Sequence, residues 1–166
     1  MESQSTSRRS FLITLGLALN AVAAALLAVP LIGYLAGALR TRTAQAWISL
    51  GSLHAFPIGQ TRLAKYQNPF TVPWDGETGH IPCWVRRLAT NEFQVFAINC
   101  THLGCPVRWF SESGLFMCPC HGGVYYADGE RASGPPPRRL YEYQYKIEDG
   151  QLWVRGGRQP TLAQPV

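Results

Sequence analysis

Two short segments of this chain, separated by 12 residues, hold four of its five cysteines and two of its four histidines. The first, residues 100–105, reads Cys-Thr-His-Leu-Gly-Cys, and the second, residues 118–123, reads Cys-Pro-Cys-His-Gly-Gly. Each segment offers both thiolates and an imidazole, which are ligands that zinc and iron–sulfur centres select. The fold therefore has to bring the two segments together around one centre, and this requirement constrains it more than any other feature of the sequence.

The mixture of ligand types in each segment leaves two kinds of metal centre open. A Cys₂His₂ set suits zinc, although a usual zinc finger takes its cysteines from one segment and its histidines from the other. A two-iron cluster in which two histidines replace two cysteines on one iron would take one cysteine and one histidine from each segment. That cluster leaves two cysteines over, and these could form a disulfide if the domain lies outside the cytoplasm.

An apolar segment near the N-terminus predicts a membrane anchor. Residues 11–39 carry no formal charge in 29 positions, and as a helix they would reach about 43 Å, beyond the ~30 Å hydrocarbon core of a bilayer. Arg8 and Arg9 stand just before this segment, which is typical of a twin-arginine signal. Residues 44–46 have the small-x-small pattern of a cleavage site, but the apolar run is about twice the upper length of a signal-peptide core. We therefore expect a retained, single-pass anchor.

The charge distribution bears on orientation and on partners. Two arginines flank the apolar segment on each side, so the orientation is inferred from the export signal alone, with the N-terminus cytoplasmic and the rest of the chain outside the cell membrane. The formal net charge is +5, but residues 47–166 hold 11 basic and 9 acidic side chains without a Lys/Arg stripe. Nucleic-acid binding is therefore not expected.

The part of the chain after the anchor has the pattern of β structure. Residues 93–98 form a nearly continuous apolar run, and residues 140–147 alternate apolar and polar side chains, as strands with one solvated face do. Residues 148–150, Glu-Asp-Gly, predict a turn into a strand at residues 151–154, and residues 111–117 predict a second hairpin. The last ten residues look frayed.

The motifs CTHLGC and CPCHGG, with SGPPP at residues 133–137, resemble the cluster-binding loops and the proline loop of the Rieske iron–sulfur proteins of cytochrome bc-type complexes. The resemblance covers nearly the whole chain. It implies a mainly β, antiparallel, sandwich-like head with an inserted cluster-binding subdomain at about residues 99–137. It also implies four parts: a cytoplasmic twin-arginine segment (1–10), a transmembrane anchor (11–39), a hinge (40–46) and a Rieske domain (47–166).

The same resemblance implies one [2Fe-2S] cluster per chain and assigns six residues to it. These are Cys100 and Cys118 as ligands of the inner iron, His102 and His121 as ligands of the outer iron, and Cys105 and Cys120 as a disulfide between the loops.

Residues around the cluster follow from the resemblance as well. Tyr125 is expected to donate a hydrogen bond to a ligand sulfur, Leu103 to cover the cluster and Pro119 to fix the second loop. Gly123 stands where some members have a serine, so one hydrogen-bond donor is missing and we expect a low reduction potential. Tyr126 is expected to pack in the core.

Four other residues receive structural interpretations. Cys83 is expected to be a buried free thiol, His54 and His80 to lie at surface or cap positions, and Trp109 to pack against the core.

The resemblance implies that the chain is a subunit of a quinol:cytochrome c oxidoreductase, within a dimeric, multi-subunit complex. Quinol bound in a cytochrome b subunit would pass one electron to the cluster and a proton to a ligand histidine, His121 rather than His102. The head would then move on its hinge to a c-type cytochrome. The low potential favours menaquinol. An alternative with the same cluster is the small subunit of a molybdenum oxidase such as arsenite oxidase.

Overall fold

The computed structural model describes residues 7–40, 45–157 and 159–162. It divides into two compact units, residues 1–42 and 43–166. The first unit is the helix α1, Arg8–Arg40, which includes Pro30. Ser7 caps its start by accepting a hydrogen bond from the Ser10 amide at 3.3 Å. Within the described residues, the 29-residue stretch Arg8–Ala36 is the one helical span long and apolar enough to cross a membrane.

The second unit, the head, is built from antiparallel strands. Its elements are β1 (Gln45–Ser52), η1 (Leu53–Ala55), β2 (Thr61–Gln67), η2 (Gly76–Gly79), β3 (His80–Ala89), β4 (Glu92–Ala97), β5 (Arg108–Phe110), β6 (Leu115–Cys118), β7 (Gly123–Tyr126), β8 (Arg131–Ser133), β9 (Tyr145–Glu148) and β10 (Gln151–Gly157). Within the described part of the head they form three sheets, in the orders β1-β10-β9, β2-β3-β4 and β5-β6-β7-β8. The mainly β, antiparallel fold predicted from the sequence is confirmed.

The two three-stranded sheets enclose the main core. Inward-facing side chains of β3 and β4, such as Val85 and Val95, pack in one cluster with Leu152 and Val154 of β10. Because alternate side chains of each strand point to this core, the two sheets form a sandwich. The free thiol of Cys83 is fully buried in the same cluster, as predicted.

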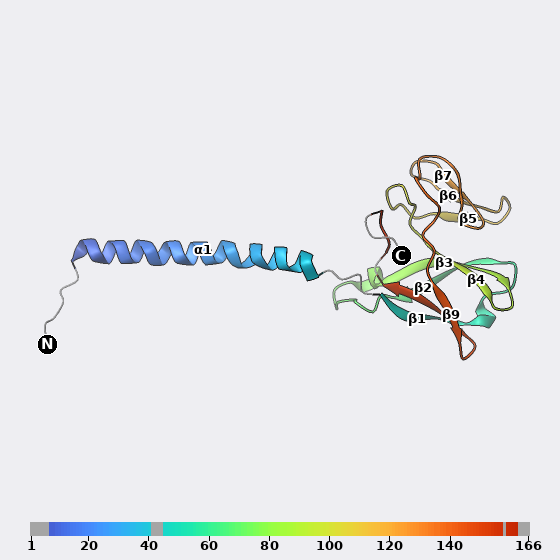
Figure 1. Ribbon diagram of the computed structural model, residues 1–166, viewed down its shortest axis with the longest axis horizontal. Coiled ribbons are helices and arrows are strands. Elements are labelled where there is room, and N and C mark those ends of the chain that lie inside the picture. The colour runs from blue at the N-terminus through green and yellow to red at the C-terminus, as the bar shows by residue number, and fades with distance from the viewer. Residues whose placement is uncertain (1–6, 41–44, 158, 163–166) are drawn as a thin grey trace. The chain divides into compact units, whose positions relative to one another are not determined.

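The four-stranded sheet forms a separate layer with its own core. Figure 1 shows β5, β6 and β7 grouped apart from β1, β2 and β9. Phe116 and Tyr125 of this sheet are buried together with Phe96, which lies near the end of β4, and with Cys100 and Cys118. The subdomain inserted between β4 and β9 therefore packs against the sandwich through the same residues that carry the predicted site.

The hairpins are formed where the turn residues predict them. β9 and β10 pair from Glu148 to Gln151, and Asp149 and Gly150 both have positive φ, 49° and 69°, as a two-residue hairpin turn requires. Gly114, with φ 64°, closes the turn between β5 and β6 through its amide, which donates to the Phe110 carbonyl at 2.9 Å.

Two expectations differ from the structure, and a third lies partly outside the described residues. The strand expected at residues 140–147 is regular only as β9; residues 140–144 run beside β4, where the Ala97 amide bonds to the Tyr141 carbonyl and the Tyr143 amide to the Val95 carbonyl. Both ends of the hinge expected at residues 40–46 belong to regular elements, because Arg40 is in α1 and β1 begins at Gln45. Residues 41–44 lie outside the described residues. Residues 1–6 of the expected twin-arginine segment lie outside them as well.

Candidate metal centre

The first of the two Cys/His loops leaves the end of β4 and is closed by its own backbone. The Cys100 amide donates to the Cys105 carbonyl at 2.7 Å, and the Gly104 amide donates to the Cys100 carbonyl at 3.0 Å. Gly104 has φ 81°, a conformation that glycine adopts without strain. These bonds turn the chain so that His102 and Leu103 form the tip of the loop.

The second loop connects β6 to β7 as a tight turn. Cys118 pairs with Gly123 at the ends of the two strands, and the Gly122 amide donates to the Cys118 carbonyl at 3.2 Å. Gly122 has φ 69°. The strand pairing of β6 with β7 therefore fixes the positions of Pro119, Cys120 and His121 at the turn.

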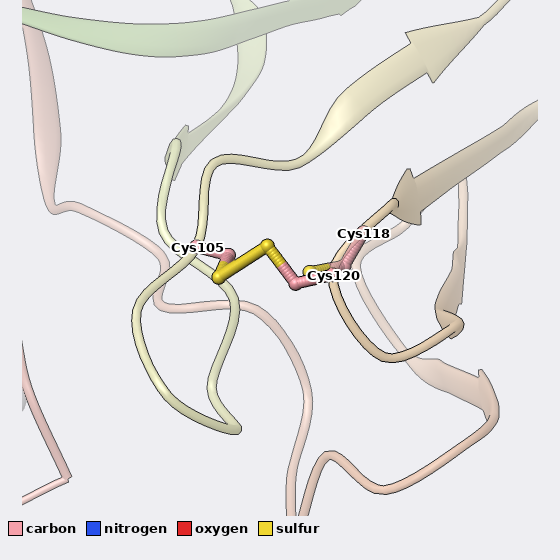
Figure 2. A group of neighbouring side chains, drawn as sticks. All are labelled: Cys105, Cys118 and Cys120. Carbon is pink, nitrogen blue, oxygen red and sulfur yellow. A yellow bond between two sulfur atoms is a disulfide. The ribbon is translucent and has the colours of Figure 1, made fainter.

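A disulfide joins the two loops. It links Cys105 of the first loop to Cys120 of the second, and Figure 2 shows the sulfur of Cys118 beside it. The three sulfur atoms lie within 4.8 Å of one another. Since the sulfurs of a disulfide are not thiolates, Cys118 is the one member of this group that is available as a metal ligand.

Four side chains at the junction of the loops have the character of ligands. Cys100 and Cys118 carry free thiols and are almost completely buried. The imidazole rings of His102 and His121 lie edge to face with their centroids 4.9 Å apart. His121 is exposed, whereas His102 is partly buried.

These groups fit a metal centre better than an ordinary core. Nδ1 of His102 is buried and finds no hydrogen-bond partner within the described residues, and a polar atom left in this way costs free energy unless something binds it. Burial also raises the pKa of the Cys100 thiol, and the hydrogen bond from Tyr125 offsets this only in part. A thiolate at this position therefore needs a neighbouring cation, which a bound metal supplies.

The hydroxyl of Tyr125 lies in a buried hydrogen-bond network beside Cys100. Its oxygen is 3.1 Å from Cys100 Sγ and accepts a hydrogen bond from the Thr101 amide at 3.0 Å. Thr101 Oγ1 lies 3.1 Å from the same oxygen and donates its own hydrogen to the Arg138 carbonyl at 2.8 Å. Burial raises the pKa of Tyr125. The phenol therefore keeps its hydrogen at neutral pH and is placed to donate it to the sulfur.

The proline loop, residues 133–137, closes the site from the other side. Pro136 is completely buried, and Arg131 Nη2 donates to the Gly134 carbonyl at 2.6 Å. A Cβ atom on Gly123 would lie 2.7 Å from Pro136 Cγ and 3.4 Å from Cys100 Sγ. A larger residue at position 123 would therefore collide with the proline loop, so close packing is one reason for glycine here, as the sequence also allowed.

Two contributions to the site were missed from the sequence. Thr101 is buried and links the first loop to Tyr125 and to Arg138. Asn99 is buried and its Nδ2 donates to the carbonyl of Pro160. Residues 159–162 therefore lie against the first loop, where they line an open pocket of about 320 Å³ together with Cys100, His102 and Tyr141, although the C-terminus was expected to be frayed.

The other predicted residues have simpler environments. Leu103 and Pro119 are exposed at the tips of their loops. Trp109 packs on Phe116, with ring centroids 4.7 Å apart, as expected. Tyr126 was expected in the core, but it is 54% exposed, because successive side chains of β7 point to opposite faces and Tyr125 occupies the inner one.

The two remaining histidines lie away from the site. Both are exposed, His54 in η1 and His80 at the start of β3. His80 lies 4.0 Å from the carboxylate of Glu77. Both positions are those expected from the sequence.

Comparison with known proteins gives a consistent family match. Residues 55–144 match the family described as the Rieske [2Fe-2S] domain. Curated proteins named "cytochrome b6-f complex iron-sulfur subunit" include one from Chlorobaculum tepidum, 51% identical over 55 residues that span 33% of this chain and 30% of the relative. The corresponding protein from Gloeobacter violaceus is 43% identical over 65 residues, 38% of this chain and 35% of the relative. The chain thus spans about a third of the length of these relatives.

Solved structures give weaker similarities. The match to the cyanobacterial plasma membrane Rieske protein PetC3 from Synechocystis PCC 6803 extends over 65% of this chain and 98% of the PetC3 chain, with 25% identity and a TM-score of 0.48. The match to a chain of a structure titled "Hyperthermophilic respiratory Complex III" extends over 84% of this chain and 98% of that chain, with 25% identity and a TM-score of 0.43.

Proposed function

Because this chain belongs to the Rieske [2Fe-2S] domain family, whose match covers more than half of it, we propose that it is the electron-transfer subunit of a membrane-bound cytochrome complex of the bc or b6f type. It takes one electron from quinol and passes it to a c-type cytochrome. The observation that carries this proposal is the division of the site into two buried cysteines and two neighbouring histidines, one of which is exposed. The names of the relatives from C. tepidum and G. violaceus support it.

Four residues would hold the [2Fe-2S] cluster: Cys100 and Cys118 on the inner iron, and His102 and His121 on the outer iron. Bound there, the cluster supplies reversible one-electron chemistry at a potential that its ligands and hydrogen bonds set. The orphaned Nδ1 of His102 and the paired buried thiols support this assignment. The disulfide between Cys105 and Cys120 holds the two loops at a fixed separation.

His121 is the residue that meets the quinol. A neutral imidazole at the surface accepts a hydrogen bond from a quinol hydroxyl and then its proton, so that electron and proton leave the quinol together. The exposure of His121, and the partial burial of His102, favour this choice. Exposed Leu103 and Pro119 at the loop tips would form the apolar rim that docks on the partner.

The helix α1 is the membrane anchor in this proposal. Its apolar span of 29 residues exceeds the ~20 that cross a bilayer. The adjacent arginines Arg8 and Arg9 support export by the twin-arginine route, with the N-terminus in the cytoplasm and the head on the outer side. The movement of the head between its partners would use the hinge predicted from the sequence at residues 40–46, of which residues 41–44 lie outside the described residues.

The partners are a cytochrome b subunit that binds quinol, with menaquinol favoured, and a c-type cytochrome, in a dimeric complex. The test is purification of the native chain in mild detergent, followed by EPR of the reduced sample, haem absorption and elemental analysis. A Rieske EPR signal together with a di-haem cytochrome b supports the proposal. Molybdenum without haem b would identify the small subunit of a molybdenum oxidase instead, and zinc without an EPR signal would reject the cluster.

Proton transfer through a ligand histidine has its own test in the reduction potential. If a ligand imidazole loses its proton more readily when the cluster is oxidised, the potential falls as pH rises through the neutral and alkaline range. Electrochemical titration of the full chain measures this slope. A potential that does not change with pH would reject proton transfer through the ligand histidine.

A further inference from the structure

Charge is divided between the two ends of the four-stranded sheet. Residues 98–139, which include this sheet, both Cys/His loops and the proline loop, contain three carboxylates and four arginines. Glu112 lies in the turn between β5 and β6, and Asp128 and Glu130 lie in the turn between β7 and β8. The second Cys/His loop joins the opposite ends of β6 and β7. The carboxylates therefore lie at the far end of the sheet, away from the cluster end where the loops meet.

One of the four arginines is neutralised at the far end. Arg139 Nε lies 3.2 Å from Glu130 Oε1, and its Nη2 lies 3.0 Å from Glu142 Oε2. The same guanidinium donates a hydrogen bond to the Asp128 carbonyl at 3.0 Å. The acidic charge of the far end is thus partly balanced by an arginine that points away from the two Cys/His loops.

Two other arginines lie beside the second Cys/His loop. Arg108, at the start of β5, lines an open groove with Gly122 and Gly123. Arg131 Nη2 donates to the Gly134 carbonyl at 2.6 Å, and a Cβ atom on Gly134 would lie 2.9 Å from the Cα of Gly123. The guanidinium of Arg131 is therefore held at the cluster end, where the proline loop packs on the second loop.

The remaining arginine, Arg138, lies beside the first Cys/His loop. Its carbonyl accepts the hydrogen bond from Thr101 Oγ1 at 2.8 Å. Burial raises the pKa of Tyr141, and the positive charge of Arg138 opposes this effect. Since Tyr141 lines the same pocket as Cys100, the charge of Arg138 acts close to the proposed cluster ligands.

The three arginines of the cluster end are not compensated. All three are exposed, and none of them forms an ion pair with a carboxylate of the described residues. Positive groups gathered in this way produce a potential that attracts anionic groups before contact and that salt screens. Arg108 also shares its groove with Pro119, so the positive charge adjoins an exposed loop tip.

We propose that the cluster end binds a protein surface rich in carboxylates through Arg108, Arg131 and Arg138, and that this surface belongs to the c-type cytochrome that accepts the electron, an inference that rests on the proposed function. Charge complementarity raises the association rate more than the affinity. It therefore suits a partner that binds and leaves in every turnover, for which small and weak interfaces are typical.

The experiment follows oxidation of the full chain, reduced and with its cluster, by stopped-flow absorbance in non-ionic detergent. Two small oxidants report the potential at the cluster end: ferricyanide, a trianion, and tris(phenanthroline)cobalt(III), a trication. Raising the ionic strength from about 10 to about 500 mM should slow oxidation by ferricyanide about tenfold and accelerate oxidation by the cobalt complex. Two soluble c-type cytochromes, one of net negative and one of net positive charge, then report docking, and the acidic cytochrome should react faster at low salt.

A double variant, Arg108→Gln with Arg138→Gln, tests the arginines directly. Arg131 is kept because its bond to Gly134 supports the proline loop. The double variant should react several-fold more slowly with ferricyanide and with the acidic cytochrome at low salt. Loss of positive charge near the cluster lowers its potential and would by itself speed oxidation by every reagent, so slower oxidation by the anionic partners is not an effect of driving force.

The matched control removes the same charge from another part of the head. Arg62→Gln with Lys65→Gln changes two exposed residues of β2, in the sandwich, and should react like the wild type with every oxidant. Equal slowing in the control and in the double variant would mean that net charge alone is responsible, and it would overturn the inference.

The remaining outcomes separate this inference from the function on which it rests. A preparation without a Rieske EPR signal rejects the cluster and the docking surface together. A chain with an intact signal that reacts equally fast with the acidic and the basic cytochrome overturns the docking surface alone. Slower reaction of the double variant with ferricyanide but not with the acidic cytochrome also overturns it, because the arginines then attract small anions without binding the protein.

Discussion

Replacing Tyr125 by phenylalanine should lower the reduction potential of the cluster by about 40 mV, from the loss of one hydrogen bond whose strength depends on redox state. The hydroxyl lies 3.1 Å from Cys100 Sγ, a proposed ligand that becomes more negative when the cluster is reduced. Hydrogen bonds to charged groups contribute about 1.5–3 kcal/mol, of which we assign about 1 kcal/mol to the difference between the two redox states. One electron converts a tenfold change in equilibrium, about 1.4 kcal/mol, into 59 mV, so about 1 kcal/mol corresponds to about 40 mV.

The same substitution should destabilise the head by about 1–3 kcal/mol, because it leaves the buried Thr101 amide without its acceptor. Potentials are read by EPR-monitored redox titration of the full chain. The matched control is Tyr126→Phe, which removes a hydroxyl from the next residue of β7, where the side chain is exposed, and should leave the potential unchanged. An intact Rieske signal at the wild-type potential in Tyr125→Phe would refute the assignment of this hydroxyl as a donor to the cluster.

Three further predictions concern the stability of the head. Replacing both Cys105 and Cys120 by alanine should leave the EPR signature unchanged in fresh protein but shorten the lifetime of the cluster, because closing this loop contributes about 3 kcal/mol by chain entropy; loss of the signature at the outset would contradict it. Burial raises the pKa of Cys83 from 9.0 to about 12. This shift contributes up to about 4 kcal/mol to the free energy of unfolding below pH 9, and that contribution is lost as the pH rises to 12. The unfolding midpoint of Cys83→Ala should fall less over this range than that of the wild type, and equal losses would contradict the burial effect. Deleting residues 159–166 leaves Asn99 Nδ2 without its acceptor and should speed the decay of visible absorbance, whereas deleting 163–166 should not; equal decay in both would contradict a role for this contact.

The parts of the fold that were predicted from the sequence depend on local patterns. The apolar run of β4, the turn at Asp149 and Gly150 and the apolar span of α1 each follow from residues that are neighbours in the chain. The strand at residues 140–147 was predicted too long, because alternation of side chains persists along an extended segment that makes only isolated bonds to β4.

The parts of the site that were missed depend on residues far apart in the chain. Asn99 finds its partner 61 positions away at Pro160, and Thr101 finds its partner 37 positions away at Arg138. Neither residue lies in a sequence pattern that would indicate its partner. The exposure of Tyr126 could have been predicted from the sequence, since alternation along a strand places it on the face opposite Tyr125.

The structure changes how the effect of Gly123 on the potential has to be tested. A serine here would add a hydroxyl near the cluster, but its Cβ would also lie 2.7 Å from Pro136 Cγ and displace the proline loop. Gly123→Ala introduces the same Cβ without the hydroxyl, so the difference between the two variants isolates the donor. We expect Gly123→Ser to have a higher potential than Gly123→Ala, because a hydrogen bond to a cluster sulfur disperses the charge of the added electron. That result would support a low-potential quinol such as menaquinol as the donor in the wild-type protein. Equal potentials in the two variants, with the EPR signature intact in both, would mean that position 123 is set by packing against Pro136 alone, and the argument for menaquinol from this site would fail.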